Sequence, residues 1–430
     1  MRVTMLTLGS RGDVQPLIAF ALGLGRAGHR VRIATYPRLA PLITAHGIEA
    51  AVLAEGALSL GSETEEGRRW VEKGHRRLPT WVGFIRDARS VAHRRLADAA
   101  AACEDADAVV ANNLAQVLGW QMSDHLGVPL VRVLFHAPTY WMTRGSSSPI
   151  GRPVRQLVWL AARPWLNMVR DQALDLPPLP LREPIGPLDR QRMPVLYPSS
   201  PSVFPLPPHA GEAAAVTGYW FLDSSLDPEP PPALLDFLAA GPPPVYIGFG
   251  TQIDVDPRAT TDLMVEAVRR AGQRGILLRP PDASGAITVA DDIFTVSAIS
   301  HAWLFPRCTA VVHHAANGTT AAGLRSGVPT VPVPHNSDQF SWAKRVHELG
   351  VATRPIPRRK LSVTALAEAL RTVAADADMR RRALTLGETI RAENGVERAV
   401  THFDRWVVPP ARSRNGRASS TRAANDVLSR

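Results

Sequence analysis

The feature that most constrains the fold of this chain is a strand that turns directly into a helix. The run Ala310 to Val312 is short and apolar and ends abruptly in polar residues, which predicts a buried strand. Asn317 to Thr320 then supply small polar residues typical of a helix start, before the helix-forming run Ala321 to Arg325. Free N–H groups and the positive end of the helix dipole make such a turn an anion site. The stretch therefore predicts an α/β fold that binds phosphate.

A second strand, Thr330 to Val333, follows this helix and ends in a loop that carries Asp338 and Gln339. Ligands of open α/β sheets bind outside the carboxyl ends of the strands, so this loop is expected beside the same ligand. On the residues alone, the pair is also explained as a solvated loop, and His314 as a buried structural histidine.

Strands alternate with helical patterns in both halves of the chain. This alternation predicts two doubly wound parallel sheets that face each other. In the first half, strands are expected over residues 2–8, 31–35, 108–111, 129–135 and 195–197, with helices over 17–27, 81–96 and around Trp120. In the second half, strands are expected over residues 245–248, 275–278 and 293–296, with helices over 234–238 and 260–270.

The length of the chain favours two domains, because 430 residues are many for one hydrophobic core. The proline-rich stretch 222–244 resists helix and sheet and is interpreted as the interdomain connection. We predict an N-terminal domain over 1–221, a C-terminal domain over 245–392, a final helix over 393–408 that packs back on the N-terminal domain, and a disordered basic tail over 409–430.

The formal net charge of +10 lies partly in this basic tail. No nucleic-acid reader motif or aromatic platform accompanies the charge, so nucleic acid is not an expected partner. Cys103 and Cys308 match no metal or redox spacing and are expected to be buried thiols in a reducing compartment. The apolar run at the N-terminus is too short for a signal peptide or a membrane span, which predicts a cytoplasmic protein.

Two helical segments have alternative interpretations. The segment Trp81 to Leu96 carries an apolar face among arginines, so it is either a surface helix packed on the core or an interfacial helix on an anionic membrane. The segment Val154 to Met168 carries Trp159 and Trp165, which either pack in the core or line an apolar acceptor pocket. Pro164 is expected to kink or break this helix.

The loop after the first strand, GSRGDVQP at residues 9–16, contains a lone carboxylate, Asp13. The loop lacks the G-x-G-x-x-G spacing, and no acidic residue ends the second strand, so nicotinamide chemistry is disfavoured. An aspartate at a helix start is usually a cap. The alternative is that Asp13 is a general base facing the space between the domains.

Three motifs of the chain occur together in one known group of enzymes. They are GSRGDVQP at 9–16, GFGT at 248–251 and HAWLFPRCTAVVHHAANGTTAAGLRSGVPTVPVPHNSDQ at 301–339. In this order they resemble the nucleotide-sugar-dependent glycosyltransferases of the GT-B fold, in the branch of sterol, glycolipid and antibiotic-aglycone glycosyltransferases. The resemblance implies two facing Rossmann-like domains, with the nucleotide sugar on the C-terminal domain and the acceptor on the N-terminal domain.

The resemblance also implies which residues contact the donor. Asp338 and Gln339 are expected to bind sugar hydroxyls, since a carboxylate beside an amide can both accept and donate hydrogen bonds. The other expected contacts are Ser297 and Ala298 at the nucleobase, and Ser10, Gly12, Thr251, His314, Asn317, Gly318, Thr319 and Thr320 at the diphosphate.

By the same resemblance, Asp13 is the catalytic base. An ionised carboxylate can accept the proton of the acceptor hydroxyl without upward tuning of its pKa, because deprotonation can lag behind cleavage of the anomeric bond. The diphosphate leaves with its charge stabilised by N–H donors, His314 and the helix dipole. A single displacement inverts the anomeric carbon, and the family implies no metal and no other cofactor.

The donor motif departs from the family at its turn. HHAANGT replaces the usual HHGGAGT, so Ala315 and Ala316 stand where glycines are usual and Asn317 stands where an alanine is usual. Glycine is favoured where the backbone takes a positive φ or approaches a ligand closely. Either the turn tolerates a Cβ or donor binding is altered, and Asn317 can offer a compensating hydrogen bond. The loop at His335 also differs and is expected to reshape the sugar pocket.

The sequence thus predicts an inverting transferase that moves a hexose or deoxyhexose from a UDP- or dTDP-linked sugar to a hydroxyl of a lipophilic acceptor, such as a natural-product aglycone, a sterol or a lipid. One alternative is a non-catalytic GT-B protein that activates a partner transferase, motivated by the altered turn. A sugar-nucleotide epimerase is disfavoured by GSRGDVQP. Peripheral contact with the inner membrane face is an alternative to a purely cytoplasmic location.

Overall fold

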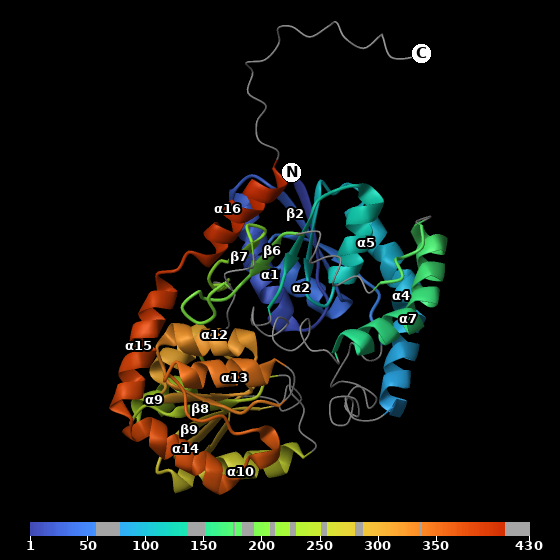
Figure 1. Ribbon diagram of the computed structural model, residues 1–430. Helices are drawn as coiled ribbons and strands as arrows, with labels where there is room; N and C mark the ends of the chain where they lie inside the picture. The colour runs from blue at the N-terminus through green and yellow to red at the C-terminus, as the bar shows by residue number, and fades with distance from the viewer. Residues whose placement is uncertain are drawn as a thin grey trace, which may run out of the picture.

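The computed structural model shows two α/β units, each built around one sheet (Figure 1). The structure describes residues 1–56, 78–135, 151–174, 177–182, 193–206, 211–223, 229–250, 256–279, 287–335 and 338–408. Thr251 and the tail 409–430, for which predictions are made above, lie outside the described residues.

The first unit contains a seven-stranded sheet in which every pair of neighbours is parallel. In spatial order the strands are β3 (Glu49–Val52), β2 (Arg30–Thr35), β1 (Arg2–Leu6), β4 (Ala108–Asn112), β5 (Leu130–Val133), β6 (Val195–Tyr197) and β7 (Ala214–Val216). The strand β1 lies between β2 and β4, and its residues from Val3 to Leu6 are buried, as expected for a central strand covered on both faces.

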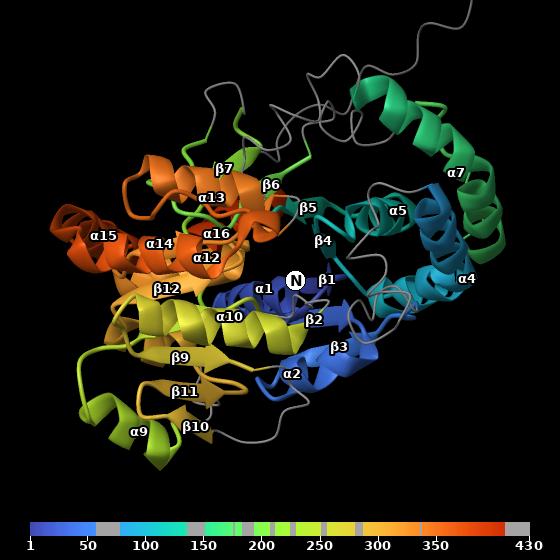
Figure 2. The same cartoon turned by 90° about the horizontal axis from the view of Figure 1, so that it is seen from below.

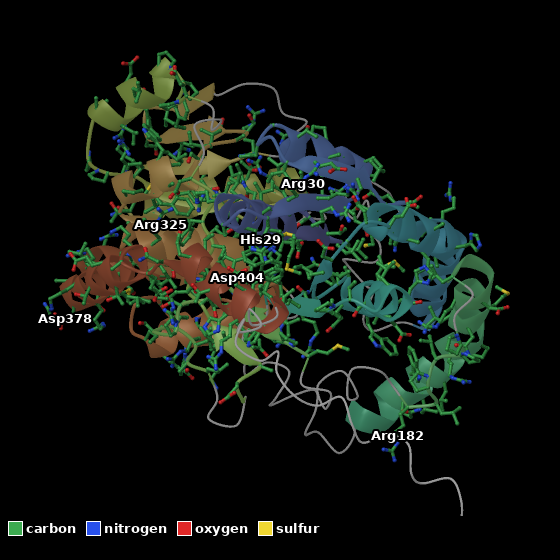
Figure 3. All side chains as sticks on the ribbon, turned by 90° about the horizontal axis from the view of Figure 1, so that it is seen from above. His29, Arg30, Arg182, Arg325, Asp378 and Asp404 are labelled. Carbon is green, nitrogen blue, oxygen red and sulfur yellow. The ribbon has the colours of Figure 1, made fainter. Side chains whose placement is uncertain are left out.

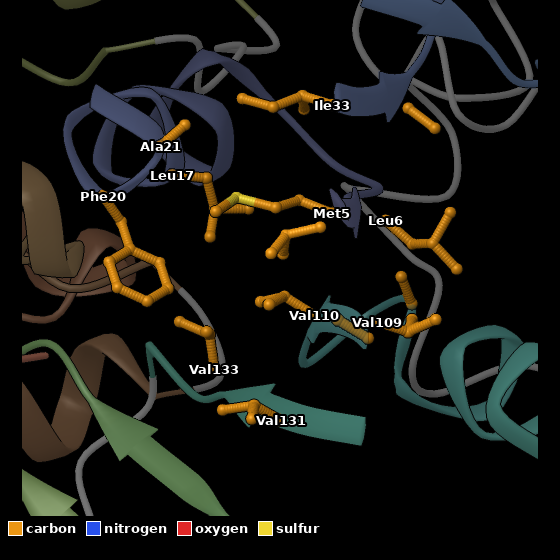
Figure 4. Close-up of a cluster of buried hydrophobic side chains, with 14 of the residues drawn as sticks. Met5, Leu6, Leu17, Phe20, Ala21, Ile33, Val109, Val110, Val131 and Val133 are labelled. Atoms are coloured by element: carbon orange, nitrogen blue, oxygen red, sulfur yellow. The ribbon is translucent and has the colours of Figure 1, made fainter. Parts of the chain in front are cut away.

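The core of this unit forms where the first helix packs on the sheet (Figure 4). The helix α1 (Arg11–Arg26) contributes Leu17, Phe20 and Ala21, which are buried against Met5 of β1. Figure 4 shows Val110 and Val133 on the neighbouring strands beside them. This packing fixes the start of α1 at the carboxyl end of β1.

The second unit contains a six-stranded sheet with one antiparallel edge. In spatial order the strands are β10 (Ile287–Ala290), β11 (Ile293–Val296), β9 (Gly275–Leu278), β8 (Val245–Gly248), β12 (Ala310–His313) and β13 (Thr330–Pro332). The strands predicted at 245–248, 275–278 and 293–296 are confirmed. The edge strand β10 was not predicted, and it runs antiparallel to β11 because the two residues between them are too few for a parallel crossover.

The helix α1 begins at Arg11, six residues before the predicted start at Leu17. The prediction that residues 9–16 form a loop is therefore wrong for most of this segment. Pro16 lies inside the helix, where it removes one backbone hydrogen bond. The start is instead set by Ser10 and Asp13, whose spacing is that of a capping box and whose hydrogen bonds are described below.

The remaining long helices pack around the two sheets. In the first unit they are α4 (Leu78–Cys103), α5 (Gln116–Leu126) and α7 (Gly151–Leu174), preceded by the short α2 (Ala40–Thr44). In the second unit they are α9 (Pro232–Ala239), α10 (Pro257–Arg270), α11 (His301–Leu304), α12 (Asn317–Ser326), α13 (Gln339–Glu348), α14 (Val363–Ala375) and α15 (Ala377–Arg391), and α16 (Gly395–Val407) ends the described chain.

The helix α7 continues through Pro164, so the predicted break is absent. Nε1 of Trp159 and Nε of Arg170 donate to carbonyl oxygens of the extended segment 177–182, at 3.0 Å and 2.9 Å. These bonds hold both halves of the helix against one segment, which offsets the hydrogen bond that the proline removes. Trp159 is buried in this contact, as expected for the packing interpretation.

The helices α4 and α7 lie side by side at the outer edge of the first unit (Figure 2). The side chains of residues 78–90, which carry most of the face predicted for a membrane contact, lie outside the described residues, so that contact stays a prediction. None of the helices in the described ranges is long and apolar enough to span a bilayer.

The chain returns to the first unit through α16, which packs on α1. The rings of Phe403 and Phe20 lie 6.1 Å apart, and Asp404 Oδ1 lies 2.9 Å from Nε2 of His29 (Figure 3). At the first residue of α16, the returning chain crosses the outgoing one: a Cβ on Gly395 would lie 2.2 Å from the carbonyl oxygen of Tyr219. The two connections between the units are thus in direct backbone contact.

Candidate active site

Both sheets have a point at which the order of the strands reverses. In the first sheet this point lies between β1 and β4, and in the second it lies between β8 and β12. Ligands of open α/β sheets bind at the carboxyl ends of the strands beside such a point. The segments found there are residues 7–13 and 113–115 in the first unit, and residues 249–250 and 314–317 in the second.

Asp13 is held at the first of these points by Ser10. Its Oδ2 accepts hydrogen bonds from the backbone N–H of Ser10 at 2.8 Å and from Ser10 Oγ at 3.1 Å. A Cβ on Gly9 would lie 2.3 Å from the same oxygen, and Gly9 has a φ of 126°, so glycine is required by both space and conformation. Asp13 is therefore the N3 residue of a capping box whose N-cap is Ser10, and its Oδ1 takes no part in these bonds.

The pKa of Asp13 is raised to about 6. The largest cause is burial of the carboxylate, which the two hydrogen bonds from Ser10 partly offset, and the charge of Asp338 raises the pKa further. The sequence-based mechanism does not depend on a raised pKa, and the raised value was not expected because burial was not visible in the sequence. Since Asp338 belongs to the second unit, the two carboxylates lie near each other between the units.

Asn112 fixes the chain just before this loop. At the end of β4, its Nδ2 donates to the carbonyl oxygen of Leu8 at 2.8 Å, and its Oδ1 accepts from the N–H groups of Leu8 at 3.4 Å and of Ala115 at 3.0 Å. The side-chain amide therefore pairs with Leu8 as a neighbouring peptide would. Sequence reasoning missed this residue, although an asparagine directly after an apolar strand is a typical turn-forming signal.

Arg38 supports the same loop from the other side. Its guanidinium donates to the carbonyl oxygen of Gly9 at 3.3 Å and to Oε1 of Glu55 at 2.9 Å. The ion pair with Glu55 holds the guanidinium in place, and two fixed side chains, Arg38 and Asn112, thus orient the loop that carries Asp13.

His314 forms the wall of the second switch point. Its ring is buried, and Gly250 of the GFGT motif packs against it, since a Cβ there would lie 3.0 Å from Cε1 of His314. Burial lowers the pKa of His314 to about 3, and the nearby His313 and His335 lower it further, so the imidazole is neutral at pH 7. Nδ1 of His314 has no hydrogen-bond partner among the described residues.

The altered turn follows His314 and contains one residue with an unusual backbone. Ala315 has a φ of 62° and is the only non-glycine residue in the described ranges with a positive φ. Its side chain is fully buried, and its N–H donates to Nδ1 of His313 at 3.1 Å. Ala316, in contrast, is extended, with φ −70° and ψ 152°. The turn therefore tolerates a Cβ at both positions, with strain only at Ala315.

The first turn of α12, which follows the turn after His314, contains polar atoms without hydrogen-bond partners among the described residues. Oδ1 of Asn317 and Oγ1 of Thr320 are buried and have no hydrogen-bond partner within the part of the chain that the structure describes. A Cβ on Gly318 would meet nothing within 4 Å, so the approach to the backbone there is open. The N–H groups of the first three helical residues, Asn317 to Thr319, have no intrahelical acceptor. Together these groups form a site with the chemistry of an anion cradle.

Asp338 and Gln339 lie at the start of α13. Asp338 does not cap this helix with its side chain, and its charge acts on Asp13 as described above. Gln339 is buried, and its Oε1 accepts from the backbone N–H of His335 at 2.8 Å. The His335 ring lies 5.1 Å from that of Phe249 and 6.4 Å from that of His314, which places this loop beside His314.

Two predicted donor contacts lie farther from the switch point. Ser297 and Ala298 are exposed and directly follow β11, which is separated from β8 by β9. Two strands, β9 and β8, lie between β11 and the strand β12 that precedes His314, and the assignment of Ser297 and Ala298 to the nucleobase stays a prediction.

Residues 276–400 match the family model "Erythromycin biosynthesis protein CIII-like, C-terminal domain", and residues 3–118 match "Glycosyltransferase family 28 N-terminal domain". A sterol 3-beta-glucosyltransferase of Arabidopsis thaliana is 32% identical over 439 residues, which cover 95% of this chain and 68% of the relative. The chain therefore belongs to the glycosyltransferase family that contains this sterol 3-beta-glucosyltransferase. The sterol 3-beta-glucosyltransferase of Neosartorya fischeri is 34% identical over 429 residues, but the chain spans only 29% of its length.

Solved structures place the glycosyltransferase in the GT-B fold. The glycotransferase of kitacinnamycin superposes with a TM-score of 0.68 at 18% identity, covering 94% of this chain and 99% of that one. CalG4, the calicheamicin glycosyltransferase, superposes with a TM-score of 0.65 at 18% identity, covering 95% and 99%. The predicted fold, two facing Rossmann-like domains, is confirmed.

Proposed function

We propose that this glycosyltransferase moves glucose or a related hexose from a nucleoside-diphosphate sugar to the hydroxyl of a sterol-like acceptor, with inversion and with Asp13 as the base. The observation that carries the proposal is the position of Asp13. It is a half-buried carboxylate at the switch point of the first sheet, within electrostatic reach of Asp338, which follows β13 of the second sheet. The names of the relatives, sterol 3-beta-glucosyltransferases, support the acceptor class and the sugar.

The reaction assigns one task to each of the two units. Oδ1 of Asp13 accepts the proton of the acceptor hydroxyl while the oxygen of that hydroxyl forms a bond to the anomeric carbon of the donor sugar. The bond from that carbon to the diphosphate oxygen breaks, and the electron pair leaves with the diphosphate. The N–H groups at the start of α12 and a ring N–H of His314 stabilise the charge that develops there. Because attack and departure occur on opposite faces, the anomeric configuration inverts.

The neutral state of His314 affects how it binds the donor. A neutral imidazole donates one hydrogen bond but contributes no charge, so in the resting site the helix terminus supplies the positive potential. Diphosphate binding favours the protonated ring and therefore raises the pKa of His314. We expect donor binding to be accompanied by proton uptake at acidic pH.

The activity is tested with purified protein, UDP-glucose and cholesterol, with the product detected by mass spectrometry. The expected product is a cholesterol hexoside of β configuration, and Asp13→Asn is expected to form it at least 100-fold more slowly, which is the lower range for loss of a general base. A screen of dTDP-linked sugars in the same assay decides the nucleobase and the hexose. An α-linked product, or full activity of Asp13→Asn, would contradict the mechanism.

The competing function is a non-catalytic partner of another transferase. The strained Ala315 favours it, because a distorted turn can weaken donor binding. Calorimetric titration with UDP-glucose and several dTDP-sugars separates the two functions. Binding with release of a hexoside in the presence of acceptor supports the enzyme, and the absence of binding to every donor supports the accessory protein.

A further inference from the structure

The turn between β4 and α5 presents one apolar side chain beside Asp13. Leu114 is 58% exposed, whereas Asn112 and Ala115 of the same turn are fully buried. A Cβ on Gly9 would lie 2.3 Å from Oδ2 of Asp13 and 3.1 Å from Cδ1 of Leu114. The carboxylate and the leucine methyl group therefore lie against the same edge of Gly9 and are close neighbours.

The exposure of Leu114 is imposed by the turn. The N–H of Ala115 donates to Oδ1 and to the carbonyl oxygen of Asn112, which fixes the peptide that follows Leu114, and Asn112 is itself held by its bonds to the backbone of Leu8. A single exposed leucine is ordinary on a protein surface, but this one is held at the switch point of the sheet, next to the candidate base.

We propose that Leu114 is a specificity-determining residue that contacts the carbon skeleton of the acceptor next to the reacting hydroxyl. This inference rests on the proposed function and names the acceptor class more closely. When the reacting hydroxyl stands alone on a hydrocarbon ring, the apolar surface of that ring covers the leucine, which is favourable. A hydroxyl of a sugar has hydroxyl neighbours, and these lose their water against the leucine methyl groups without gaining a partner. The turn therefore selects isolated alcohols over glycan hydroxyls.

The inference is tested with Leu114→Asn, which keeps the approximate size of the side chain and replaces its methyl groups with an amide. The matched control is Leu384→Ala on α15, where the leucine is 51% exposed. Steady-state kinetics are measured with cholesterol and with octyl β-glucoside as acceptors, and UDP-glucose binding is measured by calorimetry. Binding of a fluorescent sterol is titrated in parallel, since it does not require turnover.

Leu114→Asn is expected to raise the KM for cholesterol and the Kd for the fluorescent sterol about tenfold, which corresponds to the loss of one buried leucine side chain. Its activity with octyl β-glucoside is expected to be equal or higher, and its Kd for UDP-glucose unchanged. Leu384→Ala is expected to match the unaltered protein throughout. Weaker binding of the fluorescent sterol in Leu114→Asn supports the inference even if no sterol is glycosylated, in which case the proposed function alone fails. An unchanged KM and an unchanged Kd for sterol in Leu114→Asn would overturn the inference, whether or not cholesterol is glycosylated.

Discussion

The carboxylates of Asp13 and Asp338 come from different halves of the chain, and the negative charge of Asp338 raises the pKa of Asp13. A base must be deprotonated to act, so kcat/KM is expected to fall as the pH drops through about 6, the pKa of Asp13. Removal of the charge of Asp338 lowers this pKa.

The first prediction is therefore that Asp338→Asn moves the acidic limb of the pH profile to lower pH. The height of the profile is expected to fall as well, because Asp338 is the proposed partner of the sugar hydroxyls. Measurement of kcat/KM from pH 4 to 9 separates the two effects: the pH of the limb reports the electrostatic effect on Asp13, and the height reports the lost sugar contact. A limb that stays at the same pH while the height falls would show that Asp338 has no electrostatic effect on the base.

The second prediction concerns stability. A carboxyl group whose pKa is raised by folding binds its proton more tightly in the folded state, so the folded protein gains stability below the unfolded pKa of 3.8 and loses it as the pH rises to about 6. Asp13→Asn removes this loss, since an amide can still accept the two bonds from Ser10. We expect the free energy of unfolding to increase by about 2 kcal/mol at pH 8 and to change little at pH 4.

Urea unfolding at the two pH values measures this gain. The control is Asp376→Asn, because Asp376 also begins a helix and accepts from the N–H of Met379 at 2.7 Å. No gain is expected for the control. If Asp13→Asn is inactive and also less stable at pH 8, the conclusion that the ionised Asp13 carboxylate destabilises the folded protein is contradicted.

The third prediction concerns the strained turn. An alanine in the left-handed conformation costs about 1 kcal/mol relative to glycine, so Ala315→Gly is expected to stabilise the protein by up to about this amount. Ala316→Gly is the matched control, because its extended backbone suits any residue and glycine there only adds disorder to the unfolded chain. Thermal unfolding is expected to shift in opposite directions for the two variants. A shift in the same direction would contradict the backbone assignment.

The fourth prediction concerns the contact between Gly250 and His314. An alanine at 250 places a Cβ 3.0 Å from the imidazole and pushes the ring from its position, so the affinity for UDP-glucose is expected to fall. Gly272→Ala is the control: its φ of 67° resembles the φ of 64° at Gly250, but a Cβ there meets nothing within 4 Å. Both variants are expected to lose about 1 kcal/mol of stability, and only Gly250→Ala to bind the donor more weakly. Equal donor affinity in the two variants would exclude a role for the contact.

The sequence was sufficient where the determining interactions are local. The strand and helix around Ala310 to Arg325 follow from a β-branched run, small polar residues and a terminating glycine, and all of these act within a few residues. The start of α1 is a different case. The capping signal of Ser10 and Asp13 was present, but the start of the helix was placed at Leu17, where the apolar helical pattern begins.

The parts of the site that escaped prediction depend on neighbours distant in the chain. The pairing of Asn112 with Leu8 requires that β4 lie next to β1, and no local pattern fixes that order. The raised pKa of Asp13 requires burial by the assembled fold. At the altered turn, the sequence identified two unusual alanines but not which one carries the positive φ, because that depends on the burial of Ala315 and its hydrogen bond to His313 in the assembled fold.

The contact between Gly218 and Gly395 has a consequence for the design of hybrid enzymes. A Cβ on Gly218 would lie 3.1 Å from the Cα of Gly395, so the outgoing and returning connections form one compact junction rather than two independent linkers. The N-terminal half therefore includes the last described helix, α16. A chimera that exchanges C-terminal halves between relatives must cut the chain twice, before β8 and again between α15 and α16, and must keep both glycines from one parent.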